Sequence, residues 1–349
     1  MSAALAPATP AEAAEALAGL TARGEPVDVR GGGTRSARGW PGPVAGRELL
    51  TGGLRRVVAH EPADLTLTVE AGAPVADVAA LLAAAGQCWP QADARPGSTV
   101  GGVLAAAASG RSRLRDGAVR DSVLEVVLAT GDGRLVTAGG RTVKGVSGFD
   151  IPRLAVGSLG TLGVIVQVTL KLWPLPPARG WFAAEGALAD RVVVGEAALA
   201  GPPRPGAVIL TPGRLHVELT GPPEDVRPPA GLGPSGAPPA PAGAGVVEAG
   251  VPPPAVADLA RRLEAAGLPY EARMGVGTCL VAVGAAEEVG RVRAWAAELG
   301  GHAVVADAPE ELRADPWGPP PPGLAIMRRL RAAFDPAGIL NRRFLPWSA

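Results

Sequence analysis

Cysteine is scarce in this chain, whose 349 residues include only Cys88 and Cys279. The two lie far apart and form no CxxC or Cys/His spacing, which excludes a zinc or iron–sulfur site built on spaced cysteines. A disulfide framework is excluded for the same reason. We expect two buried or idle thiols and no metal site.

Lysine is almost absent and occurs only at Lys144 and Lys171. Arginine supplies the other positive charges, so that 33 basic residues balance 33 acidic ones and the sequence pI is about 6.9. This pattern contains no basic patch of the kind that binds phosphate backbones. We therefore expect no nucleic-acid partner.

Long hydrophobic runs are also missing. No stretch reaches the roughly 20 consecutive apolar residues that span a bilayer. Residues 1–10 lack a positively charged segment followed by an apolar core, which a secretory signal would contain. The sequence predicts a cytoplasmic protein without a membrane span.

Glycine and proline, by contrast, are abundant, with 49 and 37 residues. Together with the excess of alanine and arginine over lysine, isoleucine and asparagine, this composition is typical of GC-rich coding. Isolated glycines therefore carry little structural information, and only glycines clustered at expected turns are informative. The chain also exceeds the usual size of one domain, so we expect two.

Residues 1–178 show alternating helix and strand patterns. Thr9 and Pro10 mark a helix start, and the helix is expected to continue to about Ala22. Leu65–Glu70 alternates apolar and polar residues, which predicts a half-buried strand. Prolines at 174, 176 and 177 place a domain boundary near residue 178. The other expected elements are strands at 27–30, 55–60, 122–129, 134–136 and 164–172 and helices at 75–86 and 100–108.

The remaining residues predict a smaller α+β region at 179–322, followed by a last helix and tail at 323–349 that returns to the first domain. We expect a hairpin at 207–219, helices at 255–266 and 285–299, and strands at 278–283 and 302–306. Residues 221–254 are dominated by proline, glycine and alanine, with few large apolar side chains. Because such a segment cannot offset its ordering entropy by burial, we expect a mobile loop there.

Three glycine clusters carry the main chemical signal. Gly31-Gly32-Gly33-Thr34 follows a predicted strand, and successive N–H groups in such a turn can cradle a diphosphate, although most three-glycine turns in a glycine-rich chain are plain turns. The loop is not a GxGxxG fingerprint that opens a helix, which disfavours a Rossmann site. Gly101-Gly102 at a helix start and the glycines at 157, 160 and 163 offer two further places of close backbone approach. Three such loops favour one large cofactor.

An ordered series of motifs supports this interpretation. The series is Val69-Glu70-Ala71-Gly72, Thr99-Val100-Gly101-Gly102, Gly117-Ala118-Val119-Arg120-Asp121, Val143-Lys144-Gly145-Val146-Ser147-Gly148-Phe149-Asp150, Gly157-Ser158-Leu159-Gly160-Thr161-Leu162-Gly163 and Phe334-Asp335-Pro336. In these motifs residues 10–178 resemble the FAD-binding domain of the vanillyl-alcohol oxidase superfamily, which is of the PCMH type. The resemblance implies an α+β fold, with a two-lobed PCMH-type FAD-binding domain at 1–178 followed by a small α+β cap domain.

The resemblance also implies roles for individual residues. The diphosphate would be held by Gly31, Gly32, Gly33, Thr34 and Arg35 and by Ser98, Thr99, Val100, Gly101 and Gly102, and the adenosine side would be met by Gly160, Gly163, Val164 and Ile165. Some superfamily members attach FAD covalently through a His in the first glycine loop. Thr34 stands there in this chain, so we expect non-covalent FAD.

Three charged residues allow two interpretations each. Arg120 and Asp121 would support the flavin or its loop, or would form a structural ion pair at the surface. Lys144 would face the flavin and stabilise its reduced, anionic form, or would lie in solvent.

The sequence assigns no catalytic residue. Oxidation of a 2-hydroxy acid needs a base for the hydroxyl proton and a cation for the carboxylate. Related stand-alone enzymes use a His-rich cluster, which this chain lacks. Its histidines, His60, His216 and His302, are interpreted as structural or surface residues, and nothing adjacent marks its only tyrosine, Tyr270, as a base.

Within the superfamily, the series is most similar to the FAD-binding subunits of bacterial glycolate oxidases. This implies assembly with a larger FAD-containing subunit and an iron–sulfur subunit, oxidation of a small 2-hydroxy acid as glycolate to glyoxylate, and at most peripheral membrane association through the complex. Two alternatives stay open: an autonomous FAD-dependent D-2-hydroxyacid (D-lactate) dehydrogenase, and a non-catalytic flavin-fold scaffold subunit. A cell-wall precursor reductase of the same superfamily is disfavoured, because the pattern at 334–341 belongs with the oxidases.

Overall fold

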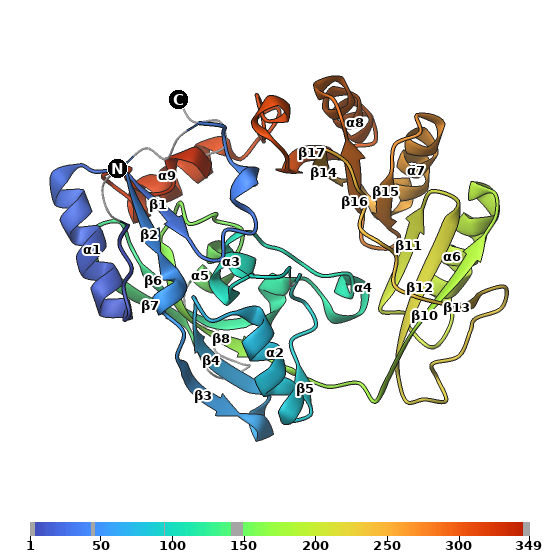
Figure 1. Cartoon of the computed structure of the whole chain (residues 1–349), viewed down its shortest axis with the longest axis horizontal. Helices are drawn as coiled ribbons and strands as arrows, with labels where there is room; N and C mark the ends of the chain where they lie inside the picture. The colour runs from blue at the N-terminus through green and yellow to red at the C-terminus, as the bar shows by residue number, and fades with distance from the viewer. Residues whose placement is uncertain (1–3, 43–45, 94, 141–148, 345–349) are drawn as a thin grey trace. The chain divides into compact units, whose positions relative to one another are not determined.

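The computed structural model describes residues 4–42, 46–93, 95–140 and 149–344. The chain forms two compact units: the first comprises Met1–Gly110, Ala118–Leu175 and Pro319–Ala349, and the second comprises Arg111–Gly117 and Pro176–Gly318. Figure 1 labels their elements. Across the described residues, no helix is long and apolar enough to cross a membrane. The expected segments ending at residues 178 and 322 differ from these units chiefly at 111–117, which joins the second unit.

The first unit is built on a five-stranded antiparallel sheet with strand order β3-β4-β8-β6-β7. Its strands are β3 (Val57–Glu61), β4 (Thr66–Glu70), β6 (Val123–Ala129), β7 (Leu135–Gly139) and β8 (Val164–Lys171). The strands predicted at 122–129 and 134–136 are β6 and β7, which form a hairpin, and Gly133 in its turn has a φ of 82°. The long β-branched segment predicted at 164–172 is β8, which lies at the centre of the sheet.

Strand β4 is more buried than its alternating sequence predicts. All five of its residues are buried, and it lies between β3 and β8 inside the sheet. Its polar side chains find partners there: Thr68 lies 2.9 Å from the Thr169 hydroxyl, and Glu70 pairs with Arg56 at 3.2 Å. The prediction of a half-buried strand is wrong here, because alternation reports side-chain polarity and not whether both faces of the sheet are covered.

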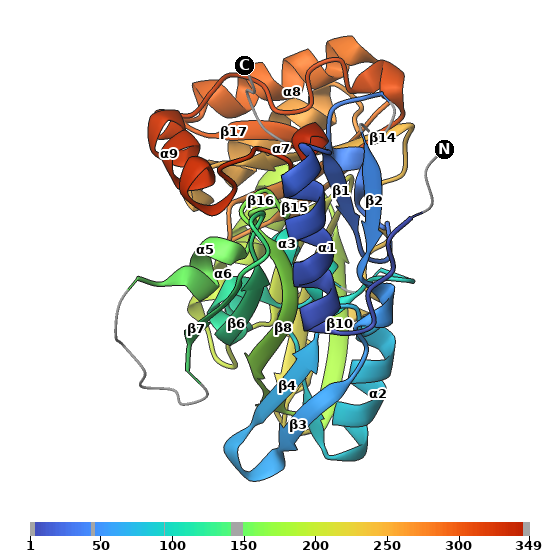
Figure 2. The same ribbon diagram turned by 90° about the vertical axis from the view of Figure 1, so that its left-hand side faces the viewer.

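Helix α1 (Pro10–Arg23) begins and ends as its sequence predicts. The Thr9 hydroxyl accepts a hydrogen bond from the Glu12 N–H at 3.2 Å, and Gly24 ends the helix with a φ of 64°. The helix packs on β6, β7 and β8, as Figure 2 shows, and buries Leu17 and Leu20 completely. The other helices of this unit are α2 (Val75–Ala84), α3 (Val100–Ala105), α5 (Ile151–Ala155) and α9 (Leu324–Phe334).

Two short strand pairs complete the first unit. β1 (Val27–Arg30) pairs in parallel with β2 (Arg47–Leu50), which the sequence did not indicate, and β5 (Gln87–Cys88) pairs with β9 (Trp173–Pro174). β1 leads directly into the glycine loop at 31–34. Its residue Val27 forms a parallel bridge with Leu340, and both are fully buried, so the C-terminal tail lies against this strand.

The second unit is built on an eight-stranded antiparallel sheet with strand order β13-β10-β12-β11-β15-β16-β14-β17. The strands are β10 (Ala178–Glu185), β11 (Ala207–Thr211), β12 (Arg214–Gly221), β13 (Gly233–Ser235), β14 (Gly245–Gly250), β15 (Tyr270–Arg273), β16 (Thr278–Val283) and β17 (His302–Asp307). One face is covered by α6 (Leu188–Ala200), α7 (Val256–Ala265) and α8 (Ala286–Glu298), and α4 (Arg113–Asp116) is a single turn that contacts β11. The sequence did not indicate α6, β10 or β15.

The expectation of a mobile loop at 221–254 is wrong for part of that segment. Residues 245–250 form β14, an interior strand paired with β16 and β17, in which Val247 and Ala249 are fully buried. Leu232 also packs into the core of the second unit. The two adjacent valines, Val246 and Val247, carried a strand signal that the surrounding glycine and proline concealed.

Candidate cofactor site

The first unit contains a pocket of about 210 Å³ at the end of β1. It is formed by the glycine loop after β1, the first turn of α3, the segment that enters β8, and the C-terminal tail. Its lining residues are Asp28, Val29, Arg30, Gly31, Gly32, Gly33, Thr34, Arg35, Ser36, Glu48, Thr51, Thr99, Gly101, Gly102, Ala105, Ala106, Leu159, Gly160, Gly163, Val164, Ile165, Asn341, Arg343 and Phe344.

The glycines of the first loop allow the chain to pack closely against itself. A Cβ atom on Gly32 would overlap the carbonyl group of Gly97, and one on Gly31 would overlap the Thr99 hydroxyl. Gly33 has a φ of 71°, which only glycine adopts readily. The loop therefore lies directly against the segment that precedes α3.

The two loops that were expected to hold a diphosphate differ in whether their backbone N–H groups are available for a ligand. The N–H groups of Val100 and Gly101 donate to the carbonyls of Ala73 (3.0 Å) and Ala71 (2.7 Å). The N–H of Gly102 donates to the Thr99 hydroxyl at 3.3 Å. These donors are already used within the protein.

The first glycine loop retains its donors. Within the part of the chain that the structure describes, the N–H groups of Gly32, Gly33 and Thr34 have no acceptor. Backbone N–H groups that line a concave pocket form an anion site without any lysine. This loop is therefore the better candidate for contact with a diphosphate.

Asn341 joins two of the pocket walls. Its Oδ1 accepts from the Val29 N–H at 2.5 Å, and its Nδ2 donates to the carbonyl of Leu159 at 2.6 Å. A Cβ atom on Gly160 would lie 2.5 Å from that Nδ2. The sequence places Asn341 in a terminal pattern but indicates no role for it in the site. Its positive φ of 42° depends on the conformation of the tail, which the sequence does not show.

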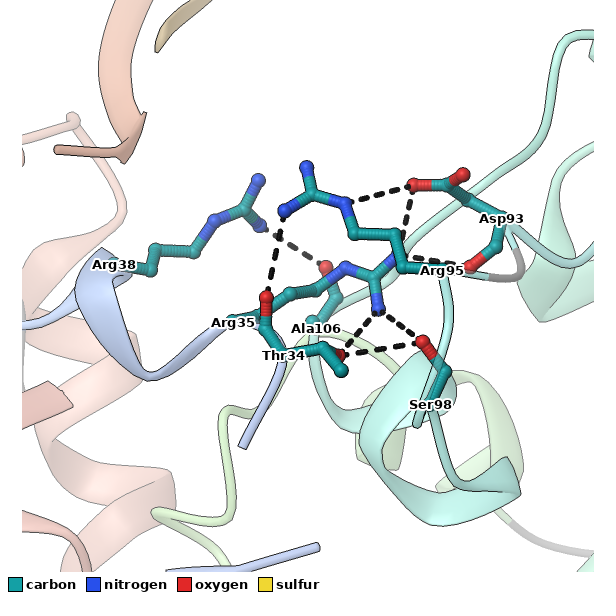
Figure 3. A network of polar contacts seen from close by, with 7 residues as sticks. All are labelled: Thr34, Arg35, Arg38, Asp93, Arg95, Ser98 and Ala106. Carbon is teal, nitrogen blue, oxygen red and sulfur yellow. Dashed lines mark hydrogen bonds and ion pairs between the residues drawn. The ribbon is translucent and has the colours of Figure 1, made fainter. Parts of the chain in front are cut away.

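Arg35 connects the glycine loop to the segment before α3. Its Nη2 donates to Oδ2 of Asp93 at 2.7 Å and to the Asp93 carbonyl at 2.8 Å, and its Nη1 lies 3.3 Å from the Ser98 hydroxyl, as Figure 3 shows. The Arg35 side chain is only 10% exposed. Burial lowers the pKa of its guanidinium, and the Asp93 carboxylate opposes that shift. The pair holds the two loops together.

Two further arginines lie beside this pair. Arg95 Nε is 3.8 Å from the Asp93 carboxylate, and Arg38 donates to the carbonyl of Ala106 at 3.1 Å. Two guanidinium groups, those of Arg35 and Arg95, therefore share the Asp93 carboxylate, and the charge of Arg38 acts on Arg35. Arginine side chains at this side of the pocket favour an anionic ligand.

The structure brings most of the predicted cofactor residues together, but not all of them. Ser98 lies behind the pocket wall, bonded to Arg35, and Val100 is fully buried in the core. Arg120 and Asp121 do not line the pocket: Asp121 lies 3.9 Å from Arg120 and 3.5 Å from Arg153, and its carboxylate accepts from the N–H of Ala118. Arg120 and Asp121 therefore form an exposed ion pair, and the Asp121 carboxylate also caps the turn that begins at Ala118. Lys144 and the motif at 143–148 lie outside the described residues.

The pocket fits part of an FAD molecule. Ligand pockets of drug-sized molecules measure roughly 300–1,000 Å³, so 210 Å³ corresponds to a portion such as the diphosphate with its flanking groups. The free N–H groups at 32–34 and the neighbouring arginines suit the diphosphate charge. Thr34 stands where a covalent link would need a His. No group of three or more His, Cys, Asp or Glu residues that could hold a metal ion occurs in the described ranges.

Comparison with known proteins defines the class to which this site belongs. Residues 1–139 match the family of FAD binding domains. This part of the chain is similar to FAD binding domains, and the cofactor is FAD.

The curated relatives are FAD-linked oxidoreductases and their subunits. The chain is 36% identical over 155 residues to the Escherichia coli glycolate oxidase subunit GlcE, covering 44% of this chain and 44% of the relative. It is 34% identical over 157 residues to the Bacillus subtilis glycolate oxidase subunit GlcD, covering 44% and 33%. It is 43% identical over 77 residues to the Archaeoglobus fulgidus D-lactate dehydrogenase, covering 22% and 17%. The match spans less than half the length of each relative.

A solved structure of alkyldihydroxyacetonephosphate synthase matches the fold. The TM-score is 0.66 with 14% identity, and the match covers 96% of this chain and 74% of the other. At that identity the likeness concerns the fold alone. The predicted α+β fold class is confirmed.

Proposed function

We propose that this protein is the FAD-binding subunit of a glycolate oxidase complex, in which glycolate is oxidised to glyoxylate. The observation that carries the proposal is the pocket at the end of β1, where backbone donors without an acceptor among the described residues lie beside Arg35, in a chain whose residues 1–139 match the FAD binding domains. The glycolate oxidase subunits among the relatives support the substrate.

The proposed reaction removes two electrons from the substrate. Bound FAD would accept a hydride from the carbon that bears the hydroxyl group, and the hydroxyl proton would leave to a base. This chain's own residues bind and orient FAD through the first glycine loop, and Arg35 and Asp93 hold that loop in place.

We assign the onward electron transfer to partner subunits. An iron–sulfur cluster is held by several cysteine thiolates, and this chain has only two cysteines, one of which, Cys279, is fully buried. Burial raises the pKa of the Cys279 thiol, which disfavours the thiolate. The proposal therefore includes a larger FAD-containing subunit and an iron–sulfur subunit, in the cytoplasm, with at most peripheral membrane association through the complex.

A second candidate is an autonomous FAD-dependent dehydrogenase for D-lactate or another D-2-hydroxy acid. D-lactate dehydrogenases among the relatives favour it. A scaffold with a non-catalytic flavin fold is the third possibility, and it requires a protein that does not retain FAD.

Flavin absorbance under anaerobic conditions distinguishes these functions. The purified, FAD-loaded chain is mixed with glycolate and, separately, with D-lactate. We expect no bleaching of the isolated chain and bleaching once the partner subunits are added. Rapid bleaching by D-lactate alone would replace the proposal with the autonomous dehydrogenase. A colourless protein whose melting temperature does not rise with FAD would support the third possibility, a scaffold with a non-catalytic flavin fold.

A further inference from the structure

One wall of the candidate cofactor pocket is acidic, although the diphosphate of FAD is itself an anion. Asp28 on β1 and Glu48 on β2 both line the pocket, and they are register partners in this parallel strand pair. Register partners carry their side chains on the same face of a sheet. The opposite face carries Val27 and Leu49, which are fully buried in the hydrophobic core. The two carboxylates therefore lie on the pocket side of β1 and β2.

Asp28 is buried without a hydrogen bond to its carboxylate. Only 6% of the residue is exposed. Among the residues that the structure describes, no group donates to this carboxylate, and its only contact is an ion pair with Arg343 at 3.7 Å, which is longer than a hydrogen bond. Buried carboxylates are normally hydrogen-bonded, because a charged group without donors is costly to remove from water. Asp28 can therefore accept hydrogen bonds from a ligand in the pocket.

The charges around this carboxylate favour a neutral donor over a metal ion. Burial raises the pKa of Asp28, the charge of Arg343 opposes that shift, and the charge of Glu48 adds to it. Glu48 in turn pairs with Arg30 at 3.3 Å. Each carboxylate thus has one arginine beside it, and these two cations would repel a metal ion. Neutral groups that donate hydrogen bonds would stabilise the ionised form of Asp28.

The position of Asp28 restricts which part of FAD can meet it. An ionised carboxylate only accepts hydrogen bonds, whereas the diphosphate has no donor to offer and would be repelled. Asp28 lies three residues before Gly31, which is about 10 Å along the strand at about 3.3 Å per residue. A neutral group joined directly to a diphosphate held at 32–34 can therefore reach Asp28. In FAD these groups are the ribose of the adenosine half and the ribityl chain of the flavin half, and each carries hydroxyl groups on neighbouring carbons.

We propose that Asp28 binds a vicinal diol of FAD beside the diphosphate, with Glu48 as a second acceptor. The pocket then has two chemically distinct parts: backbone N–H groups at 32–34 receive the anion, and the acidic wall receives hydroxyl groups. The inference rests on FAD as the cofactor and not on the proposed oxidation of glycolate.

Binding of the two halves of FAD tests the assignment. The full chain is stripped of FAD and titrated by calorimetry at pH 8, where ionisation of Asp28 is favoured. ADP is compared with 2′,3′-dideoxy-ADP, and FMN with an analogue that lacks the ribityl hydroxyls. We expect one pair to show a preference of about tenfold or more for the hydroxylated compound, because hydrogen bonds to a charged acceptor are strong. The pair that shows the preference identifies the diol as that of the ribose or of the ribityl chain.

Substitution of Asp28 should remove this preference. In Asp28→Ala the hydroxylated compound should lose about tenfold in affinity and its hydroxyl-free analogue less than about twofold, because only the former uses the carboxylate. Asp28→Asn keeps the shape of the side chain without its charge and should show an intermediate preference. This second variant guards against misfolding of the first, and far-ultraviolet circular dichroism checks both. The rise in melting temperature with each compound gives an independent measure of the same preferences.

Two further variants separate hydroxyl binding from other effects of Asp28. Asp64→Ala removes an exposed carboxylate of the same unit and should leave all affinities unchanged within about twofold, which controls for the change in net charge. Arg343→Gln removes the ion pair with Asp28. It should affect a compound and its hydroxyl-free analogue alike, so that the preference persists.

Three outcomes would overturn the assignment. These are the absence of a preference in both pairs of compounds, a preference that survives in Asp28→Ala, and equal losses of a compound and its hydroxyl-free analogue in that variant. The last outcome would show that Asp28 only supports the local fold through Arg343. The titrations involve no substrate, so their result is separate from that of the bleaching experiment.

Discussion

The glycines of the first loop allow two segments of the backbone to pack closely against each other. The sequence suggested that Gly32 leaves room for the cofactor, but its missing side chain would point at the carbonyl of Gly97. The N–H groups at 32–34, which have no acceptor among the described residues, line the pocket because the loop can lie that close to its neighbour. Substitution at Gly32 therefore changes stability and cofactor retention together.

Gly32→Ala should lose FAD and lower the free energy of unfolding by about 1–3 kcal/mol, because two backbone segments must separate. The FAD-to-protein ratio after purification and the melting temperature are the measurements. Gly140→Ala is the control, since a Cβ there meets nothing within 4 Å. A Gly32 variant with normal FAD content and stability would show that the loop does not lie against Gly97.

His216 couples the second unit's stability to pH. Burial lowers its pKa in the folded protein below the usual 6.5. As pH falls through 6.5, the unfolded chain therefore takes up a proton that the folded protein does not, and stability decreases. The stabilising contribution of neutral His216 is fully present above that pH.

His216→Gln should show a smaller loss of stability between pH 7 and pH 5.5 than the unchanged protein, because this proton uptake is removed. Urea unfolding at each pH measures it, and His302→Gln serves as the control on an exposed histidine. Parallel pH profiles for the His216 variant and the unchanged protein would contradict the assigned shift.

At the scale of elements, the C-terminal tail lines the candidate cofactor pocket. α9 and the residues after it lie far from β1 in sequence, yet Leu340 bridges to Val27 and Asn341 joins Val29 to Leu159. Asp335 sets this conformation, since its buried carboxylate accepts from the N–H groups of Ile339 (3.1 Å) and Leu340 (2.9 Å).

Asp335→Ala should cost about 3 kcal/mol or more, because two buried N–H groups lose a charged acceptor. It should also weaken FAD binding, since Asn341 follows these residues directly. Chemical denaturation and titration with FAD measure the two effects. Asp132→Ala removes an exposed carboxylate that contacts Thr130 and Arg134 and should change stability by less than about 1 kcal/mol. Equal effects of the two substitutions would refute this role of Asp335.

At the scale of the whole molecule, each compact unit is assembled from separate stretches of chain. The first combines residues up to 110 with 118–175 and the C-terminal segment, and the second takes in 111–117. The three arginines of that short segment all contact the second unit: Arg111 reaches Glu271, Arg113 reaches Thr278, and Arg115 reaches Thr220. Whether the whole molecule oxidises a substrate alone or only with partners is decided by the bleaching experiment.

Local sequence determined the elements and the cofactor loops of the first unit. A capped helix start at Thr9, the turn at Gly133 and the clustered glycines at 31–33 and 160–163 act through neighbours in the chain, so their consequences can be predicted from short segments. The tertiary structure alone decided the full burial of β4, the place of β14 within a sheet, the exclusion of Arg120 and Asp121 from the pocket, and the meeting of Asn341 with β1. These depend on contacts between residues far apart in the chain, and hydrophobic periodicity carries no information about which distant segment will pack beside it. The same reason explains why His216 resembles a structural histidine in the sequence, since its burial and the nearby charge of Arg111 arise only once β12 and the 111–117 segment come together.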